Sequence, residues 1–290
     1  MPLVNMKPML SAARRGGWAV AAFNPVDYAS MKAVIQAAAE LNAPVICQTS
    51  AKTVKYYGHE AIASWARELA GAVRVPVALH LDHGKDLKLI ERCIETGWTA
   101  VMIDASDKPY AENLALTRQV LQMAAGQDVG VEAEIGEIGG VEEDIVVAEE
   151  KSHHADANQA LDFCRAAPDL AVFAPAIGTA HGIYKKEPSI DWDVLTRISK
   201  GTAMPLALHG GTGLSDAIIQ RSIRLGCSKI NISTNLKHVF IDDFVSYNDN
   251  HPTEYEPLKV LEAQFSGMKA LAIEKIRQFG GAGRADDIHG

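Results

Sequence analysis

Several features that mark other classes of protein are missing from this sequence of 290 residues. Its four cysteines are widely spaced and form no C-x-x-C pair, so there is no sign of a disulfide framework. Each cysteine falls in an apolar run, where we expect a small buried side chain. No apolar run reaches the ~20 residues of a membrane-spanning helix, and the N-terminal segment lacks the core and cleavage site of a signal peptide. These absences predict a cytoplasmic protein with no membrane partner.

Positive charge is also in short supply. Lys and Arg number 28, against 36 for Asp and Glu, and the formal net charge is −8. The sequence contains no basic stripe, and an acidic surface repels the phosphates of nucleic acids. We therefore expect no nucleic-acid partner, while a local group of donors can still bind a small anion.

The dinucleotide-binding signature G-x-G-x-x-G is missing after the first predicted strand, where AFNPVDYAS stands instead. That absence counts against a doubly wound open sheet, which is the alternative fold. Near-continuous apolar strands that alternate with amphipathic helices predict a parallel sheet covered on both faces. Eight such units predict a single-domain TIM (β/α)8 barrel over residues 1–290. The predicted strands are 18–23, 44–50, 76–82, 100–106, 129–136, 170–178, 204–210 and 227–234.

Two stretches break this alternation of strands and helices. Residues 136–157 show no clear periodicity and are rich in Gly, Glu and His, which is typical of a mobile lid or binding loop, or else of a disordered segment. Residues 246–258 are also irregular in pattern. They precede a helical pattern over 259–279, which we expect to form a C-terminal helical extension.

Polar residues collect where the predicted strands end, and these ends meet at one face of a barrel. The segment LHLDHG places Asp82 beside His83. Neighbouring strand residues point to opposite faces, so both can serve one site only if the strand stops or kinks there. Three histidines at three strand ends, His83, His181 and His209, match the ligand count of a catalytic zinc site. Glu134 is a candidate fourth, exchangeable ligand.

A glycine-rich turn, HGGTG at 209–213, stands between a predicted strand and a predicted helix. Such a turn offers backbone N–H groups and a helix N-terminus to an anion. Gly182 leads into Lys185, which adds positive charge nearby. These features favour a phosphate site, although a glycine in a strand–helix turn is weak evidence by itself.

The strand CSKINIST places Lys229, Asn231 and Ser233 on one face by its period of two. Ile230 and Ile232 take the other face, toward the helices. An inward Lys229 leaves three interpretations open: a structural residue, an ion pair with a Glu, or a Schiff base with substrate. The histidine cluster favours a metal mechanism over the Schiff base.

Taken in order, the motifs HLDHG, VEAEIG, AIGTAHGIY, LHGGTG and KINIST resemble the class II, metal-dependent fructose/tagatose-bisphosphate aldolases. The resemblance extends over nearly the whole chain. It implies a lyase that reversibly joins dihydroxyacetone phosphate to an aldehyde, so the partner is a small sugar phosphate. It also implies Zn²⁺ as cofactor, a monovalent cation (Na⁺ or K⁺) near the phosphate, and a homodimer or homotetramer.

The same resemblance implies roles for individual residues. The three histidines hold zinc, with Glu134 as the further ligand, and Asp82 exchanges a proton with the C4 hydroxyl of the sugar. In the segment GGVEED, Glu142 handles the C3 proton of dihydroxyacetone phosphate, with Glu143 as the neighbouring alternative. The expected substrate-binding residues are Asn24, Ser50, Gly182, Lys185, Gly210, Gly211, Thr212, Gly213, Asn231, Ser233 and Thr234.

The sequence departs from the family at a few positions. Thr212 stands where relatives often have Ser, and Ser233 where they often have Asp or Asn. Relatives commonly read Y-[DE]-P-R near the C-terminus, with an Arg that reaches the distal phosphate from a neighbouring subunit, and Leu258 occupies that position here, followed by Lys259. The aldehyde half of the substrate is therefore open between fructose, tagatose and another ketose or deoxy-sugar phosphate.

Two readings from other functional classes compete with an aldolase. A zinc hydrolase on the same barrel would also use histidines and a carboxylate, but the phosphate-type glycine turns count against it. A non-catalytic sugar-phosphate-binding protein would need the turns but not the set of Asp and Glu residues beside the histidines.

Overall fold

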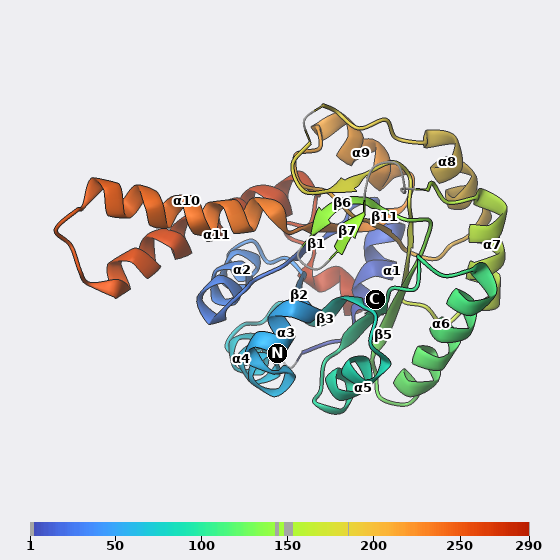
Figure 1. Ribbon diagram of the computed structural model, residues 1–290, viewed down its shortest axis with the longest axis horizontal. Helices are drawn as coiled ribbons and strands as arrows, with labels where there is room; N and C mark the ends of the chain where they lie inside the picture. Colours follow the sequence, from blue (N-terminus) through green and yellow to red (C-terminus); the bar gives the residue numbers. More distant parts are fainter. Residues whose placement is uncertain (1–2, 143–144, 148–152, 185, 290) are drawn as a thin grey trace.

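The predicted barrel is confirmed. The computed structural model describes residues 3–142, 145–147, 153–184 and 186–289, and eight parallel strands close into a barrel in the order β1-β2-β3-β4-β5-β8-β10-β11 (Figure 1). All eight predicted strands are present, with shorter bounds in most cases. The barrel strands are β1 Val20–Phe23, β2 Val45–Ser50, β3 Val77–Gly84, β4 Ala100–Ile103, β5 Gly130–Ile135, β8 Val172–Pro175, β10 Leu206–Leu208 and β11 Cys227–Ile232.

Helices connect the strands and cover the outside of the barrel (Figure 1). Several begin at an Asp whose side chain accepts a backbone N–H of the first turn, as Asp27, Asp86, Asp156 and Asp191 do. These caps fix where each helix starts after its strand, and so they position the loops at the carboxyl face. The outer helices are α2 Tyr28–Glu40, α3 Ala51–Tyr57, α4 His59–Gly71, α5 Leu87–Glu95, α6 Tyr110–Ala124, α7 Ala157–Ala166, α8 Trp192–Gly201 and α9 Asp216–Arg224.

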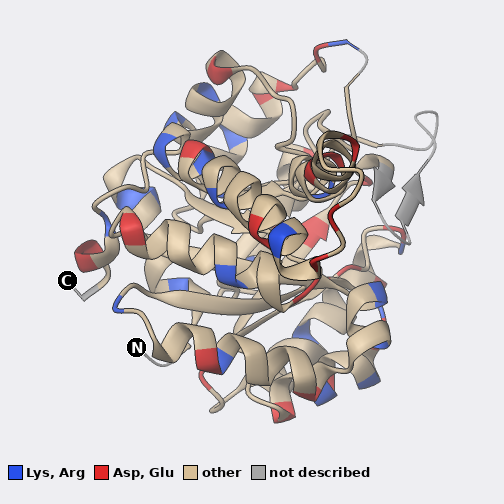
Figure 2. Cartoon of the chain, turned by 90° about the vertical axis from the view of Figure 1, so that its left-hand side faces the viewer, with Lys and Arg blue, Asp and Glu red and all other residues tan. Residues whose placement is uncertain are grey.

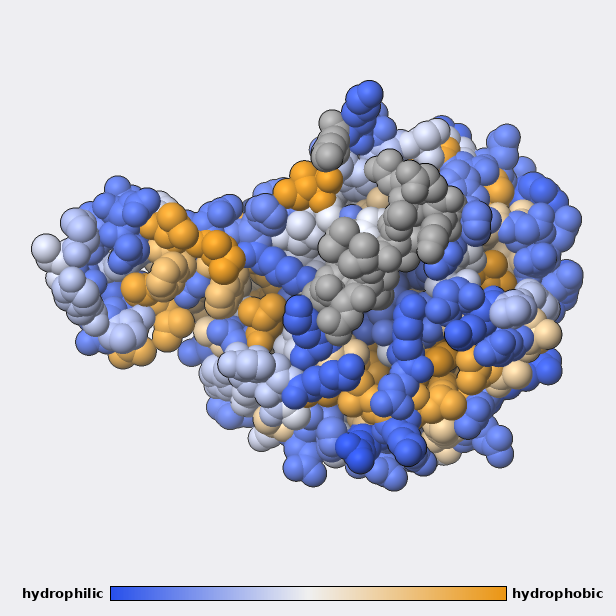
Figure 3. Space-filling view, in the orientation of Figure 1, coloured by the Kyte–Doolittle hydropathy of each residue, from blue (hydrophilic) through white to orange (hydrophobic). Residues whose placement is uncertain are grey.

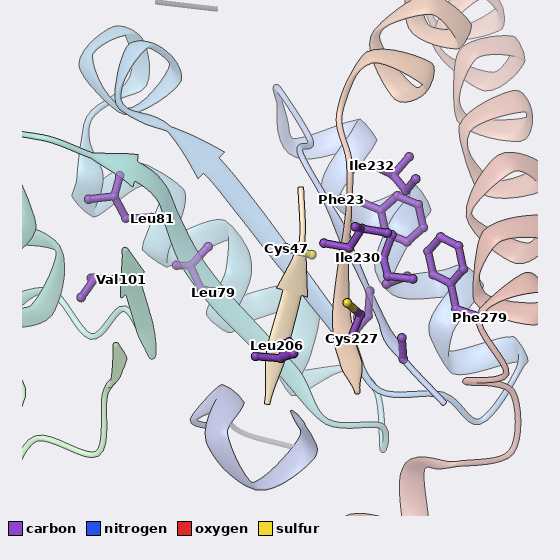
Figure 4. Packing of buried hydrophobic residues seen from close by; sticks show 14 of the residues in the cluster. Phe23, Cys47, Leu79, Leu81, Val101, Leu206, Cys227, Ile230, Ile232 and Phe279 are labelled. Carbon is purple, nitrogen blue, oxygen red and sulfur yellow. The ribbon is translucent and has the colours of Figure 1, made fainter. Parts of the chain in front are cut away.

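The core divides between the outside and the inside of the barrel. Phe23 and Ile230 face outward and pack near Phe279, the residue that follows the last long helix (Figure 4). On the inside, inward-facing strand residues such as Ala78 share an apolar cluster with Met6 and Met9 of helix α1 (Met6–Gly16). Every second residue of a strand faces the same way, so the inward face of β3 continues from Ala78 toward Asp82 at the carboxyl end. The inner face therefore changes from apolar to polar toward that end.

A small second sheet lies beyond the barrel and corrects one expectation. Residues 136–157 were expected to lack regular structure, but β6 (Gly139–Glu142) pairs antiparallel with β7 (Ile145–Val147) and parallel with β9 (Ala180–His181). Gly140 pairs with His181 and has φ 105°, and a Cβ there would lie 2.2 Å from the carbonyl oxygen of His181. Only glycine permits this approach, which explains why a glycine-rich segment forms strands.

The C-terminal extension is a projecting pair of helices, α10 (Thr234–Asn250) and α11 (Pro257–Gln278) (Figure 1). The extension was predicted, but the expectation of irregular structure was wrong for 246–250, which continue α10. These residues are polar on every side because they face only α11 and solvent, so no apolar period marks them. Basic and acidic residues are interspersed along the helices (Figure 2). In the described part of the chain, no helix is both long and apolar enough to cross a membrane.

Candidate active site

Three histidines converge at the carboxyl end of the barrel, as predicted. His83 is the second-last residue of β3, His181 ends β9, and His209 follows β10. One nitrogen from each ring lies within 4.8 Å of the other two, and all three residues are buried. Nε2 of His83 and Nδ1 of His209 lie 2.9 Å apart. Three imidazole nitrogens therefore surround one point.

The strand that carries Asp82 and His83 is kinked, as it must be for both side chains to face one site. His83 has φ 49°, in the left-handed region that non-glycine residues seldom adopt. The register of β3 against β4 shifts between Leu81 and Gly84. The kink turns the imidazole of His83 toward the other histidines while Asp82 stays inside the barrel. A backbone outlier of this kind costs about 1–3 kcal/mol and is common at functional sites.

Two buried carboxylates hold the outer nitrogens of these rings. Oδ2 of Asp104 lies 2.9 Å from Nδ1 of His83, and Oε1 of Glu132 lies 2.8 Å from Nε2 of His209. The ammonium of Lys229 lies 2.9 Å from Oε2 of Glu132. Lys229 is thus the partner of a Glu, one of the three interpretations left open by the sequence. Because carboxylates hold the outer nitrogens of His83 and His209, the opposite nitrogens of these two rings face the centre.

The donor set fits a zinc ion. Burial lowers the pKa of His181 to about 3 and that of His209 to about 4, so both rings are neutral at neutral pH, the form that binds metals. Oε2 of Glu134 lies 3.7 Å from Nδ1 of His209. Burial, reinforced by the charge of Asp104, raises the pKa of Glu134 well above its usual range. Burial by itself would lower the pKa of His83, but Asp82 and Asp104 raise it to about 10, so its ring is protonated in the metal-free protein and would lose a proton when a metal binds. A cation here also favours the ionised form of the Glu134 carboxyl group, so Glu134 can join the three histidines as a ligand.

The carboxylate of Asp82 is held in one orientation at the bottom of the site. Oδ2 accepts hydrogen bonds from the amide of Asn24 at 2.9 Å and from the amide of Gln48 at 3.1 Å. The amide of Asn231 lies 3.5 Å from Oδ1. Burial by itself would raise the pKa of Asp82, but the combined positive charge of His83, Lys229 and the neighbouring histidines outweighs burial and lowers it to about 2. Asp82 is therefore an ionised, oriented base.

A hollow suited to a small anion adjoins the histidines. Gly182 and Gly210 have φ 100° and 64°, and a Cβ on Gly210 would lie 2.3 Å from the carbonyl oxygen of Ala180. The hydroxyl of Tyr184 ties the two turns together, because it accepts from the N–H of Ala180 and donates to the carbonyl of Gly210, each at 2.8 Å. The hollow is lined by His181, Gly182, Gly210, Thr212, Asn231, Ser233 and Thr234, all of them predicted from the sequence.

The other predicted site residues do not belong to the lining of this hollow. The N–H of Gly211 donates to the carbonyl of Asn231 at 3.1 Å, so Gly211 shapes the turn, and Gly213 follows it. Ser50 pairs in register with Asp82 and caps α3. The backbone of Glu142 lies at the end of β6, two residues beyond the pairing of Gly140 with His181. Lys185 and Glu143 lie outside the described residues.

Sequence reasoning assigned no role to Asp104 or Gln48. Asp104 lies near the end of the strand predicted over 100–106, much as Asp82 ends the strand predicted over 76–82, so the signal was present but did not distinguish a partner of histidine from a base. Gln48 lies two residues beyond the inward-facing Ile46, and strand period alone indicates that its amide faces the barrel interior.

Leu258 and Lys259 lie far from the barrel of their own chain. Both belong to the first turn of α11, at the tip of the projecting helices (Figure 1). Lys259 forms an ion pair with Glu254, and the side chain of Leu258 is 64% exposed. Neither residue reaches the histidine cluster within one chain.

Comparison with known proteins places these features in a family. The sequence profile described as fructose-bisphosphate aldolase class-II matches residues 4–284. The YdjI aldolase of Escherichia coli K12 has 31% sequence identity to this chain and a TM-score of 0.85, covering 98% of this chain and 99% of its own. The fructose-bisphosphate aldolase of Campylobacter jejuni has 22% identity and a TM-score of 0.84, covering 97% and 96%. At that identity the second likeness shows the fold alone.

Proposed function

The chain belongs to the class II fructose-bisphosphate aldolase family and is a lyase, and we propose that it is a zinc-dependent aldolase of ketose bisphosphates. In this proposal it reversibly cleaves a fructose- or tagatose-type 1,6-bisphosphate to dihydroxyacetone phosphate and an aldehyde. The observation that supports it best is the oriented carboxylate of Asp82 directly beside the kinked His83 and its two partner histidines.

Zinc held by His83, His181 and His209, with Glu134 as exchangeable ligand, would supply Lewis-acid polarisation of the ketone oxygen. Asp82 takes the proton of the C4 hydroxyl. The electrons of that O–H bond form the new aldehyde C=O as the bond between C3 and C4 breaks, and the electrons of the C3–C4 bond stay on the dihydroxyacetone phosphate half as an enediolate.

The dihydroxyacetone phosphate half of the substrate needs residues of its own. The turns at Gly182 and Gly210, together with the N-terminus of α10 at Thr234, bind the phosphate of the dihydroxyacetone half. Glu142 then returns a proton to C3, which completes the ketone product. A monovalent cation, Na⁺ or K⁺, beside that phosphate belongs to the same proposal, because it offsets the charge of a dianion bound mainly by neutral groups.

A homodimer or homotetramer is also proposed. Apolar side chains gather on the projecting helices, where they are visible in Figure 3. The exposed residues are Ile241, Phe244, Val245, Tyr255, Leu258 and Leu261. Such a patch is typical of a surface covered by another copy. Phe244→Asp should lower the mass of the oligomer measured by light scattering, and an unchanged mass would contradict this interface.

A cytoplasmic location is proposed because all four cysteines are free and buried.

The alternatives make distinct demands on the site. An aldolase for another ketose or deoxy-sugar phosphate needs the same metal and Asp82 but a different aldehyde pocket. A zinc hydrolase needs a water-activating base and no proton donor for C3. A non-catalytic binding protein needs neither the kink at His83 nor the buried base, and both features favour an enzyme.

The test is cleavage of fructose 1,6-bisphosphate and tagatose 1,6-bisphosphate, followed by reduction of released dihydroxyacetone phosphate in a coupled assay. Dipicolinate should abolish cleavage, and added Zn²⁺ should restore it. Asp82→Ala is the matched inactive variant. Full turnover in metal-free protein, with borohydride trapping of substrate on Lys229, would overturn the zinc mechanism. Release of inorganic phosphate without dihydroxyacetone phosphate would favour the hydrolase.

A further inference from the structure

We propose that Lys229, inside the barrel, is a positioning residue for the side-chain amide of Asn231. Its ammonium turns that amide so that the NH2 group, and not the carbonyl oxygen, faces Asp82 and the hollow beside Gly182 and Gly210, here called the phosphate-type hollow. The dihydroxyacetone phosphate half of the substrate then meets a hydrogen-bond donor at this position. The inference rests on the proposed aldolase function and adds a residue that serves it without touching the substrate.

Lys229 is among the largest fully buried side chains of the described chain. It alternates along β11 with Ile230 and Ile232, which face the helices (Figure 4). Its neighbours in register are Val20 on β1 and Ala207 on β10, both members of the apolar cluster inside the barrel. The strands around the lysine are therefore apolar at this level, and its charge needs polar partners of its own.

The ammonium of Lys229 has two such partners. Nζ lies 2.9 Å from Oε2 of Glu132 and donates to Oδ1 of Asn231 at 2.7 Å. A lysine paired with a carboxylate is an ammonium, which has three donors and no acceptor. The carbonyl oxygen of Asn231 must therefore point toward Lys229, because a reversed amide would set its NH2 group against the ammonium, donor against donor.

The direction of this amide decides what Asp82 and the substrate meet. With Oδ1 on Lys229, Nδ2 of Asn231 lies 3.5 Å from Oδ1 of Asp82. A reversed amide would place a carbonyl oxygen against the carboxylate, and the two would repel each other. At 3.5 Å the contact is long for a hydrogen bond, so the NH2 group keeps the capacity to donate to a substrate oxygen in the hollow that Asn231 lines.

The backbone of Asn231 is held by other contacts. The N–H of Gly211 donates to its carbonyl at 3.1 Å, and Ala22 is its neighbour in register on β1. These contacts leave the rotation of the terminal amide open. Its oxygen and its NH2 group are similar in size, so packing does not choose between the two orientations, whereas a charged donor does. Lys229 is that donor.

Glu132 provides a rival explanation for a buried Lys229. Oε1 of Glu132 lies 2.8 Å from Nε2 of His209, so a lysine that only balanced this carboxylate would act on the metal centre. The two explanations predict different losses when the lysine is removed. Loss of the amide orientation weakens binding of dihydroxyacetone phosphate, whereas loss of support for His209 weakens binding of zinc.

The experiment measures exchange of the C3 proton of dihydroxyacetone phosphate in deuterated water, by the intact zinc-loaded protein, over a range of substrate concentrations. The variants Lys229→Met and Asn231→Ala and their double variant form a mutant cycle. Ile230→Val is the control, because it removes buried apolar volume from the same strand on the face toward the helices. Competition with a chromogenic chelator gives the zinc affinity of each variant without reference to turnover.

Lys229→Met should raise the KM for dihydroxyacetone phosphate by about 10- to 100-fold, as expected for loss of a charge-assisted contact. The maximal rate of exchange should stay within about twofold, the range of an ordinary substitution away from the reacting atoms. The double variant should be no more than about twofold worse than Asn231→Ala, because the lysine acts through that amide. Zinc affinity should fall by less than the roughly 10-fold expected when a histidine loses its partner. Ile230→Val should resemble wild type.

A further pair of variants covers the case in which Lys229→Met does not fold because Glu132 has lost its counter-ion. Lys229→Met combined with Glu132→Gln removes both buried charges, and Glu132→Gln by itself is the reference for it. The raised KM should appear in the combined variant and not in its reference, since Glu132→Gln keeps the contact between Lys229 and Asn231.

Four outcomes would overturn the inference. Additive losses in the mutant cycle would show that Lys229 and Asn231 act independently. A loss of zinc affinity of about 10-fold or more with an unchanged KM would assign Lys229 to the metal centre through Glu132. An equal loss in Ile230→Val would mean a general distortion of the strand. A wild type that exchanges the proton, with variants that lose nothing, overturns this inference alone, whereas a wild type that neither exchanges the proton nor cleaves a ketose bisphosphate overturns the proposed function as well.

Discussion

Oδ2 of Asp104 lies 2.9 Å from Nδ1 of His83, and both side chains are almost completely buried. The hydrogen bond holds the imidazole so that Nε2 faces His209. It also explains how His83 keeps its ring direction in spite of a strained backbone. Partners of this kind set the tautomer and the basicity of a metal-binding histidine.

The first prediction concerns this partner. Asp104→Ala should weaken zinc binding by about 10- to 100-fold, because His83 loses the group that orients its ring. Competition with a chromogenic chelator measures the affinity. Asp107→Ala is the control, because Asp107 is a partly exposed residue that contacts Lys85 rather than a histidine. Equal zinc affinity in the two variants would contradict the role of Asp104.

The second prediction separates the base from the metal. Asp82→Ala should lose cleavage of the bond between C3 and C4 while it keeps zinc, because Asp82 acts on the C4 hydroxyl. Exchange of the C3 proton of dihydroxyacetone phosphate should persist, since that step involves no C4 hydroxyl. Mass spectrometry in deuterated water follows the exchange. Loss of both reactions in a variant with full zinc content would show that Asp82 has another role.

The barrel could be predicted from the sequence because its strands are buried on both faces and therefore form continuous apolar runs. The same property made some predicted strands too long. The strand predicted over 170–178 ends at Pro175, yet Ala176 and Ile177 beyond it are also buried. An apolar run records burial, whereas the end of a strand depends on hydrogen bonds that composition does not reveal.

The residues that face the metal centre and phosphate-type hollow were found because they follow strands and share residue types that bind metals or anions. Their outer partners were harder to find. The contact between His209 and Glu132 joins residues 77 positions apart, and its geometry depends on the twist and register of the closed barrel.

The third prediction follows from the buried thiols. Burial raises the pKa of Cys47 to about 12, and the same holds for the other three cysteines. Above about pH 8.5, thiols ionise in the unfolded chain but not in the folded one, so the free energy of unfolding should fall as pH rises toward 12. Each fully buried thiol contributes at most about 2 kcal/mol to the loss at pH 10.

Urea unfolding at pH 8 and pH 10 tests this effect. Cys47→Ala should reduce the loss of stability between the two pH values, although it destabilises the protein at both. Val45→Ala is the matched control, because it removes buried apolar volume from the same strand without removing a titrating group. The explanation fails if Cys47→Ala loses as much free energy of unfolding between pH 8 and pH 10 as wild type and Val45→Ala do.

The last prediction concerns the strand beside His181. Gly140 pairs with His181, and Glu142 follows Gly140 by two residues in the same strand. This strand belongs to the segment that was expected to cover the substrate. If Glu142 transfers the C3 proton, Glu142→Ala should slow exchange of that proton by about 10²- to 10⁴-fold, the usual contribution of a general acid–base. Zinc content should not change, since three histidines remain. Glu143→Ala is the comparison, because the sequence offers Glu143 as the neighbouring alternative in the segment GGVEED. A larger loss in Glu143→Ala would transfer the role to that residue, and little loss in either would remove this strand from the proton transfer altogether.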